Sequence, residues 1–266
     1  MNNLEIFCVT HLPLSFLDTL GYNIAGAGNT KFPSNYLPCN TGDNIVDKEK
    51  YYSEYVFHYW FWKNKLKNYN NNTWIGFCQR RRFWLQTNAG STPVNAEDLN
   101  KIILKKIPKE WSDHESIIQP PTNLKEKKMV MIKRGYKSLL KDPTILFNQS
   151  KQTIKLHFDM HHGHGNLDKA IDLMNDNDRE DFRLYVNSST DFSANNMFIS
   201  KKEFIDKWFQ SVFSWLFSCE KVFGFKNLKG YETTRIYAYL AERYLSFWFK
   251  KYTNYIYWPW TFTDLK

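Results

Sequence analysis

The chain has 266 residues, of which 42% are hydrophobic and 18% aromatic, so it can form a core and global disorder is not expected. Its net charge of +9 favours anionic partners, namely nucleic acid, an anionic membrane surface or phosphorylated substrates. No apolar run approaches the length of a membrane span, and the four scattered cysteines form no Cys-x-x-Cys pair, which indicates free thiols in a reducing compartment.

A strand is predicted at the start of the chain. Residues 4–10 are rich in β-forming side chains and are not preceded by a secretion signal, so we expect a cytoplasmic protein. Residues 23–44 are rich in Gly, Pro and Asn and predict mostly loop. Residues 49–65 have the spacing of a helix. Within that helix, Glu54 and His58 lie one turn apart, and either fits a satisfied core residue.

Two further strands are predicted in the middle of the chain. Residues 73–78 predict a buried strand, directly followed by three arginines. Residues 115–121 predict a second buried strand that its prolines end. The basic stretch 122–145 has no clear period, and we interpret it as a loop over a site.

The last third of the chain is mainly helical in prediction. Residues 168–174 predict a short helix and residues 195–202 a strand. Residues 201–223 predict a strongly amphipathic helix, and residues 233–251 predict the last helix. Strands that alternate with helices indicate an α/β fold.

Five motifs then carry a family resemblance. They occur in this order: TGDNI at 41–45, YYSEYVFHYWFWKN at 51–64, WIGFCQRRRFW at 74–84, NNMFISKKEFIDKW at 195–208 and RIYAYLAERYLSFW at 235–248. The set resembles the family called domain of unknown function 4422. Its members resemble glycosyltransferases and occur among enzymes of capsule, exopolysaccharide and lipopolysaccharide synthesis. The likeness covers nearly the whole chain.

The resemblance implies a fold, a reaction and partners. We expect a GT-A-like nucleotide-sugar-binding domain with a mixed, mostly parallel sheet and C-terminal amphipathic helices. The expected single domain spans residues 1–266, with a donor-nucleotide half at 1–121 and an acceptor half at 122–266. The implied substrates are a nucleoside-diphosphate sugar and a growing glycan, free or lipid-linked.

The three arginines suggest how the leaving diphosphate is stabilised. The family motif usually runs Cys-His-Tyr-Arg-Arg-Tyr-Phe; Gln79 here replaces its His and Arg80 its Tyr, while Arg81 and Arg82 match. Guanidinium groups bind phosphate oxygens in bidentate fashion and repel a divalent cation. We therefore expect Arg81 and Arg82 to bind the donor, and we expect no required metal or other cofactor. Alternatively, these arginines are solvated or pair with structural carboxylates.

A histidine cluster at 157–164 supports an alternative function. His-x-His pairs with nearby acids occur in zinc and di-metal hydrolases, but the match is partial because Asn166 and Leu167 stand where further ligands are needed. His162 occupies the position where the family tends to carry a His. We predict a substrate-facing catalytic role for it, with metal binding and a local structural role left open.

The last predicted helix carries a possible base. Arg235 and Glu242 lie together off its apolar face, and Arg243 borders that face. A carboxylate beside an arginine on a rigid helix is a reasonable general base for an acceptor hydroxyl. The alternative is an ordinary surface salt bridge. We predict Glu242 as catalytic, and Arg235 and Arg243 as binding residues.

The remaining predicted donor contacts lie near strand ends and loops. Thr10 and His11 end the first strand, where α/β sheets place ligands. Asp43 and Asn44 either cap the following helix or touch the donor. Asn195 and Asn196 either hydrogen-bond sugar hydroxyls or shape a turn, and we predict Asn196 as a binding residue.

The C-terminal tail, residues 247–266, combines many aromatic side chains with Lys250 and Lys251. Such a composition suits a membrane interface, and we predict possible peripheral contact with the inner face of the cell membrane. The alternative is that the tail folds back on the core. A basic nucleic-acid-binding protein is the second alternative function, but most aromatics fall on helix core stripes and no RNA or DNA signature occurs.

Overall fold

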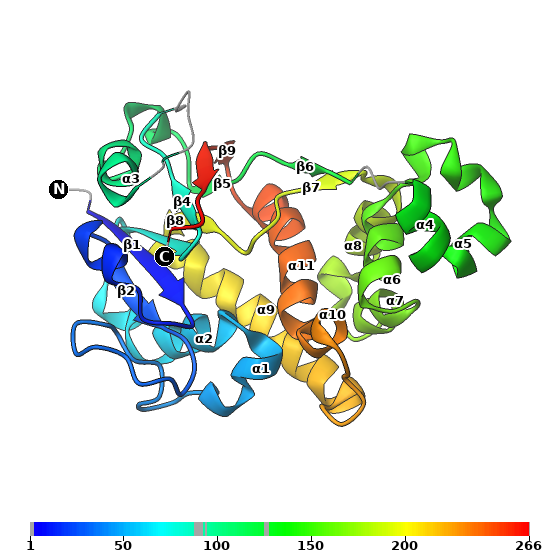
Figure 1. Ribbon diagram of the computed structural model, residues 1–266, viewed down its shortest axis with the longest axis horizontal. Coiled ribbons are helices and arrows are strands. Elements are labelled where there is room, and N and C mark those ends of the chain that lie inside the picture. The colour runs from blue at the N-terminus through cyan, green and yellow to red at the C-terminus, as the bar shows by residue number, and fades with distance from the viewer. Residues whose placement is uncertain (1–2, 88–92, 94, 125–127, 266) are drawn as a thin grey trace. The chain divides into compact units, whose positions relative to one another are not determined.

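The computed structural model describes residues 3–87, 93, 95–124 and 128–265. The chain divides into two compact units, each with its own interior (Figure 1). The first unit consists of Met1–Pro120, Asn195–Ser211 and Phe249–Lys266, and the second of Pro121–Ala194 and Val212–Trp248. The first boundary between the units follows Pro120, beside the boundary predicted at residue 121. Residues 195–211 and 249–266 come later in the chain but belong to the first unit.

Three parallel strands form one side of the sheet in the first unit. Strand β1 (Leu4–Thr10) lies between β2 (Asn23–Gly26) and β3 (Trp74–Gln79) and is parallel to both. The register pairs Cys8 with Cys78, so the two strands end at the same edge. The prediction for residues 23–44 missed β2, because NIAG is short and runs directly into the Gly-rich loop.

The other strands extend this sheet beyond β3. Strand β8 (Phe198–Lys201) is antiparallel to β3 and to β5 (Ser116–Ile118), and β5 is parallel to β9 (Tyr255–Tyr257). The sheet is therefore mixed, and the predicted α/β class is confirmed.

A short hairpin and the C-terminal tail complete the sheet. Strand β4 (Arg82–Trp84) folds back antiparallel on β3 and pairs with β10 (Trp260–Phe262). The indole N–H of Trp258 donates to the carbonyl of Leu85 at 2.8 Å. The tail thus folds back into the sheet, which is the alternative to the membrane interpretation of residues 247–266.

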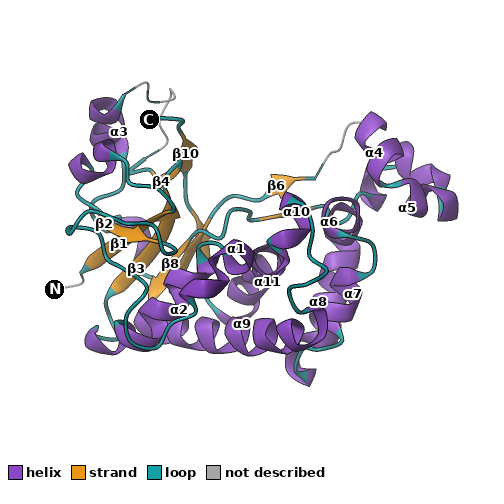
Figure 2. Cartoon of the chain, turned by 60° about the horizontal axis from the view of Figure 1, so that its bottom comes forward, coloured by secondary structure: helices purple, strands orange, loops and turns teal. Residues whose placement is uncertain are grey.

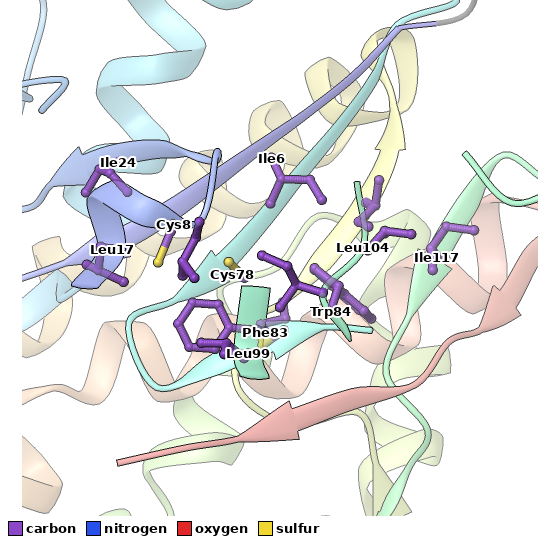
Figure 3. Packing of buried hydrophobic residues seen from close by; sticks show 14 of the residues in the cluster. Ile6, Cys8, Leu17, Ile24, Cys78, Phe83, Trp84, Leu99, Leu104 and Ile117 are labelled. Carbon is purple, nitrogen blue, oxygen red and sulfur yellow. The ribbon is translucent and has the colours of Figure 1, made fainter. Parts of the chain in front are cut away.

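Short helices cover the strands of the first unit and close its core. They are η1 (Ser15–Thr19), η2 (Val46–Lys48), α1 (Glu49–Tyr52), α2 (Tyr55–Asn64), η3 (Leu66–Asn68), α3 (Ala96–Ile102) and η4 (Lys109–Trp111). Buried side chains of β1, β3 and β4 pack with Leu17 of η1 and Leu99 of α3 in one cluster (Figure 3).

The helix predicted over 49–65 is broken in the structure. Helix α1 ends at Tyr52 and α2 begins at Tyr55, because Ser53 has a φ of 51° that an α-helix does not allow. The next residue, Glu54, is buried, at 8% exposed. In an uninterrupted helix it would be one position among others on the helix surface. The break therefore sets the position of this carboxylate.

The second unit is helical apart from a two-stranded ribbon (Figure 2). The ribbon joins β6 (Thr122–Asn123) to β7 (Asp191–Phe192). Its helices include α4 (Lys128–Arg134), α5 (Tyr136–Lys141), η5 (Pro143–Leu146), η6 (Gln149–Lys151), α6 (Ile154–His162), α7 (Asn166–Ile171), α8 (Asp176–Ser188) and α10 (Tyr231–Thr234). Residues 122–145 thus contain two helices where the sequence predicted a loop.

Two long helices belong partly to each unit. They are α9 (Lys202–Phe223) and α11 (Ile236–Tyr252), and both were predicted within three residues of their ends. In the second unit, Phe182 packs edge-on against Trp215 and Tyr244, and the Tyr244 hydroxyl donates to the buried Asp178. No helix in the described part of the chain is long and apolar enough to cross a membrane.

Candidate active site

Polar side chains gather at the carboxyl ends of β1 and β3 in the first unit. His11 directly follows β1, and Gln79 is the last residue of the adjacent β3. The break between α1 and α2 brings Ser53 and Glu54 to the same edge, because Ser53 Oγ lies 3.4 Å from His11 Nε2 and Glu54 contacts Gln79. This edge is where open α/β sheets bind ligands.

Glu54 is the centre of what we call the carboxylate cluster, formed by Ser53, Glu54, Gln79, Asn195 and Asn196. Its Oε1 accepts hydrogen bonds from Gln79 Nε2 at 3.0 Å and Asn196 Nδ2 at 2.8 Å. Burial alone would raise the pKa of Glu54, but hydrogen bonds from Ser53, its own backbone and Asn196, with the nearby His11, lower that pKa below its ordinary value. The structure therefore keeps a buried negative charge at the strand ends.

Backbone strain concentrates around the same carboxylate. Ser53, Asn195 and Asn196 have φ angles of 51°, 75° and 51°, and they are the non-glycine residues with positive φ in the described part of the chain. The Asn195 carbonyl also accepts from Gln79 Nε2 at 2.8 Å. Strained conformations of this kind persist where surrounding contacts fix them, and they concentrate at functional sites.

His11 and Thr10 have different surroundings at the end of β1. His11 Nδ1 lies 2.8 Å from Glu49 Oε1, so the imidazole joins α1 to the carboxylate cluster. Thr10 Oγ1 donates to the Leu12 carbonyl at 2.5 Å and accepts from the Leu12 N–H. The Thr10 side chain therefore stabilises the turn that follows β1.

The arginines lie in a hairpin turn beside the carboxylate cluster. Arg82 Nη1 donates to Gln79 Oε1 at 3.0 Å, so the Gln79 amide connects the Arg82 guanidinium with the Glu54 carboxylate. Arg81 forms an ion pair with Asp264 at 3.0 Å, and its guanidinium carbon lies 4.8 Å from the centre of the Phe262 ring. Arg81 thus pairs with a structural carboxylate, which the sequence had left open as the alternative to donor binding.

The Thr-Gly-Asp-Asn segment is docked on α2. Trp60 Nε1 donates to Thr41 Oγ1 and the Tyr59 hydroxyl donates to Asp43 Oδ1, each at 3.1 Å. Asn44 Oδ1 accepts from the Val46 N–H, so the Asn44 side chain forms a turn directly before η2. Asp43 is thus bonded to α2, and Asn44 to the start of η2. The sequence had left both residues between helix capping and donor binding.

The second unit contains a separate group, the arginine cluster, formed by Arg243, Glu242, His157 and His162. The Arg243 side chain is 2% exposed, and its Nη1 contacts Glu242 Oε2. Its Nη2 lies 3.2 Å from His157 Nδ1 and 3.4 Å from His162 Nε2. The guanidinium carbon also lies 4.3 Å from the centre of the Phe192 ring. A buried cation is thus held by a carboxylate, two imidazoles and an aromatic face.

The contacts of His162 fix its tautomer. Nδ1 lies 2.8 Å from the Glu232 carbonyl, which only accepts, and Nε2 faces Arg243, which only donates. The hydrogen is therefore on Nδ1 and the lone pair on Nε2. Burial, reinforced by the charge of Arg243, lowers the pKa of both His157 and His162 to about 2. In this arrangement His162 is neutral, with Nδ1–H donating to the Glu232 carbonyl and Nε2 accepting from Arg243.

Arg235 lies at the border of the same helix, outside the arginine cluster. Arg235 Nη1 donates to the Tyr231 hydroxyl at 3.4 Å rather than to the Glu242 carboxylate. Its guanidinium carbon lies 4.9 Å from the centre of the Tyr231 ring. Tyr239 stacks on His162 with ring centres 4.0 Å apart.

Metal ligation has little support in these clusters. No group of three or more His, Cys, Asp or Glu side chains in the described residues is arranged to hold a metal ion. His157 and His162 direct ring nitrogens at a guanidinium, which is a poor neighbour for a divalent cation.

Only part of the carboxylate cluster was predicted from the sequence. Asn195 and Asn196 were considered as sugar contacts or turn formers and Glu54 as a core residue, whereas Ser53 and Gln79 were not predicted as site residues. One signal was present, because Ser53 and Glu54 are the polar pair inside the aromatic run YYSEYVF. A carboxylate in such a run must find hydrogen-bond donors when it is buried.

Comparisons with known proteins agree with this fold. The family model described as "Domain of unknown function (DUF4422)" matches residues 5–254. A solved structure described as the apo form of WbbM, a bifunctional glycosyltransferase, aligns with 99% of this chain at a TM-score of 0.73 and 17% identity. The chain spans 46% of that protein's length. No curated protein matches the sequence. The structural likeness shows the fold alone, and it agrees with the expected GT-A-like α/β fold.

Proposed function

Because this chain belongs to the DUF4422 family, whose model covers residues 5–254, and has the fold of a solved glycosyltransferase, we propose that it is itself a glycosyltransferase. The proposed reaction moves a sugar from a nucleoside-diphosphate sugar to a growing capsular, exopolysaccharide or lipopolysaccharide glycan.

The observation that carries the proposal is the carboxylate cluster at the ends of β1 and β3. A buried charge held by four donors costs folding free energy, and strained backbone at three residues adds to that cost. Such an arrangement orients the amides of Gln79 and Asn196 at the edge where a donor would bind. We assign Glu54 as a positioning residue for these amides.

The arginines supply the proposed charge complement to the donor. Breaking the bond between sugar and diphosphate builds negative charge on the leaving phosphate oxygens. A guanidinium presents five N–H donors in a fixed fork, and the Gln79 contact fixes the direction of the Arg82 fork. Arg82, with Arg81 beside it, is the proposed diphosphate ligand, which makes a divalent metal unnecessary.

The arginine cluster supplies the proposed acceptor chemistry in the second unit. Glu242 remains the proposed general base for the acceptor hydroxyl, and its side chain is 15% exposed. Arg243, held by His157 and His162, fixes the carboxylate in place. His162 is proposed to position Arg243, which revises its expected role as a catalytic residue that meets substrate.

The alternatives have weaker support. A metal hydrolase would need ring nitrogens that His157 and His162 direct at Arg243. A nucleic-acid-binding function would rest on the net charge of +9 alone. For location, we propose a cytoplasmic enzyme that contacts the inner face of the cell membrane peripherally.

Titration calorimetry of the full chain with UDP, GDP and CMP tests the proposal. At least one nucleotide should bind, and Arg82→Ala should weaken that binding more than Arg82→Lys, because Lys keeps the charge but loses the fork. Lys101→Ala is the matched control, since Lys101 is an exposed cation that pairs with the exposed Glu97. Absence of binding by all three nucleotides in folded protein would refute the donor site.

A further inference from the structure

The helices α4 and α5 of the second unit expose an unusual number of apolar side chains. Among the large hydrophobic side chains exposed in the described residues, four lie on these helices: Met129 (75%), Ile132 (50%), Tyr136 (53%) and Leu140 (82%). A fifth, Phe147 (78%), directly follows η5. Single exposed apolar residues are ordinary, but a group of them marks an interaction surface.

The inner face of the same segment is already used. Met131 and Ile145 are buried against Leu156 and Met160 of α6, with Leu139 packed at the edge. The exposed apolar residues therefore lie on faces that this core does not need. A helix with apolar residues on its outer as well as its inner face needs a second partner.

Spacing places the exposed residues together on each helix. Met129 and Ile132 are three apart on α4, and Tyr136 and Leu140 are four apart on α5. The two helices follow each other almost without a break, since Gly135 N–H donates to the Met131 carbonyl at 2.7 Å.

Lysines border this apolar stripe. Three exposed lysines each come directly after an exposed apolar residue in the sequence: Lys133, Lys137 and Lys141. On the other side, Lys128 Nζ lies 4.9 Å from the centre of the Phe147 ring, which brings Phe147 to the start of α4. The only acidic residue between 128 and 151 is Asp142, and it pairs with Lys151.

We propose that this basic apolar surface docks on an anionic lipid membrane. It is formed by Met129, Ile132, Tyr136, Leu140 and Phe147 with Lys128, Lys133, Lys137 and Lys141. Apolar side chains enter the boundary between head groups and acyl chains, and the flanking lysines contact anionic head groups. The structure thus moves the expected membrane contact from the C-terminal tail, which is part of the sheet, to α4 and α5. The proposal is independent of the glycosyl transfer chemistry.

The charge pattern favours lipid over other occupants. A symmetric contact with a second copy would bring the same lysines together, which like charges oppose. Nucleic acid would find stacking partners only in Tyr136 and Phe147 among these five apolar residues, and it would leave the aliphatic Met129, Ile132 and Leu140 without a suitable partner. A sheet of anionic head groups above an apolar layer satisfies both parts of the surface.

Cosedimentation with vesicles tests the proposal. The full chain should bind vesicles of phosphatidylglycerol and phosphatidylcholine at low salt, bind pure phosphatidylcholine vesicles at least tenfold more weakly, and lose affinity as salt rises. No binding to the anionic vesicles, or equal binding to both kinds, would overturn it.

Two variants separate the charged from the apolar contribution. Replacing Lys133, Lys137 and Lys141 by Gln should weaken binding roughly 100-fold, because each lysine near an anionic surface contributes about a fivefold factor. Met129→Gln with Leu140→Gln should weaken binding at least tenfold and should leave thermal unfolding unchanged, since both side chains are exposed.

Matched controls come from exposed residues elsewhere in the second unit. Leu184→Gln with Val222→Gln, and Lys226→Gln with Lys229→Gln, should bind vesicles as the unchanged chain does. Equal losses in these controls would contradict the assigned surface. A change of oligomeric state in the α4 and α5 variants, or binding of oligonucleotides in place of vesicles, would likewise overturn the lipid assignment. Nucleotide binding measured by calorimetry stays unaffected, so failure here is distinct from failure of the donor site.

Discussion

At the residue scale, buried polar side chains divide into those with full sets of partners and those without. Glu54 receives hydrogen bonds from Gln79 and Asn196, whereas His58, one turn later, has no hydrogen-bond partner at Nδ1 in the described residues. The His58 ring instead lies 4.5 Å from the Phe77 ring and 4.9 Å from the Tyr55 ring, centre to centre. The two residues therefore respond differently to substitution.

His58→Phe should stabilise the protein. Phenylalanine fills similar space in this aromatic surrounding and removes an unsatisfied buried nitrogen, so the free energy of unfolding at pH 7 should rise by about 1 kcal/mol. Urea unfolding measures this change. A loss of more than a few tenths of a kcal/mol would mean that the His58 nitrogens make a contact that stabilises the fold.

The same variant should change the pH dependence of stability. Burial lowers the pKa of His58 from 6.5 to about 4, so the unfolded chain binds a proton there that the folded chain does not. The contribution of His58 to stability is therefore complete above pH 6.5 and falls as the pH decreases toward 4, by about 1.4 kcal/mol per pH unit for one proton. His58→Phe should reduce this slope by one proton, and an unchanged slope would contradict the assignment.

Glu54→Gln should destabilise the first unit and impair nucleotide binding. Glutamine has an NH₂ group in place of one carboxylate oxygen. This group would face hydrogen-bond donors that the Glu54 carboxylate satisfies in the unchanged chain, so about 1–3 kcal/mol of stability should be lost. Glu97→Gln is the control, because Glu97 is an exposed partner of Lys101 and its substitution should leave the unfolding midpoint unchanged. Equal unfolding midpoints for both variants would show that Glu54 needs no charge.

At the element scale, the Thr-Gly-Asp-Asn loop shows how a motif can serve the fold. Gly42 has a φ of 58°, and a Cβ at this position would collide with Asn64 Oδ1, which accepts from the Asp43 N–H. The glycine allows both the turn and the close approach to α2. The motif is explained by docking without reference to a ligand.

Gly42→Ala should therefore cost more than an ordinary left-handed glycine. Backbone strain alone costs about 1–2 kcal/mol, and the collision with Asn64 adds to it. Gly21→Ala is the control, since Gly21 has a φ of 73° with no atom within 4 Å of its added Cβ. Thermal unfolding should show a clearly lower midpoint for Gly42→Ala, and equal midpoints would mean that the loop can move away from α2.

Helices and strands whose hydrophobic side chains recur with a clear period could be predicted from the sequence. The residues of the candidate site could be predicted only in part. Strand 4–10 and the helix ending at Phe223 follow from side-chain pattern alone. The break at Ser53 could not, because its positive φ depends on contacts of Glu54 with Gln79 and Asn196 from distant parts of the chain. His162 was predicted near a site, but its tautomer needs the carbonyl of Glu232, which no spacing indicates.

At the scale of the whole molecule, we expect donor binding without a metal. Nucleotide binding measured by calorimetry should be equal in EDTA and in Mn²⁺ if Arg81 and Arg82, as proposed, supply the positive charge that a metal supplies elsewhere. Binding that EDTA abolishes and Mn²⁺ restores would contradict the proposed role of these arginines.

The central claim is that a nucleoside diphosphate binds at the carboxyl ends of β1 and β3. Amide hydrogen exchange with and without a saturating concentration of the nucleotide found by calorimetry tests it most directly. Exchange should slow at residues 10–12, 79–82 and 195–197, where the strand ends and the carboxylate cluster lie. Slower exchange confined to the second unit, with these three segments unchanged, would contradict the account.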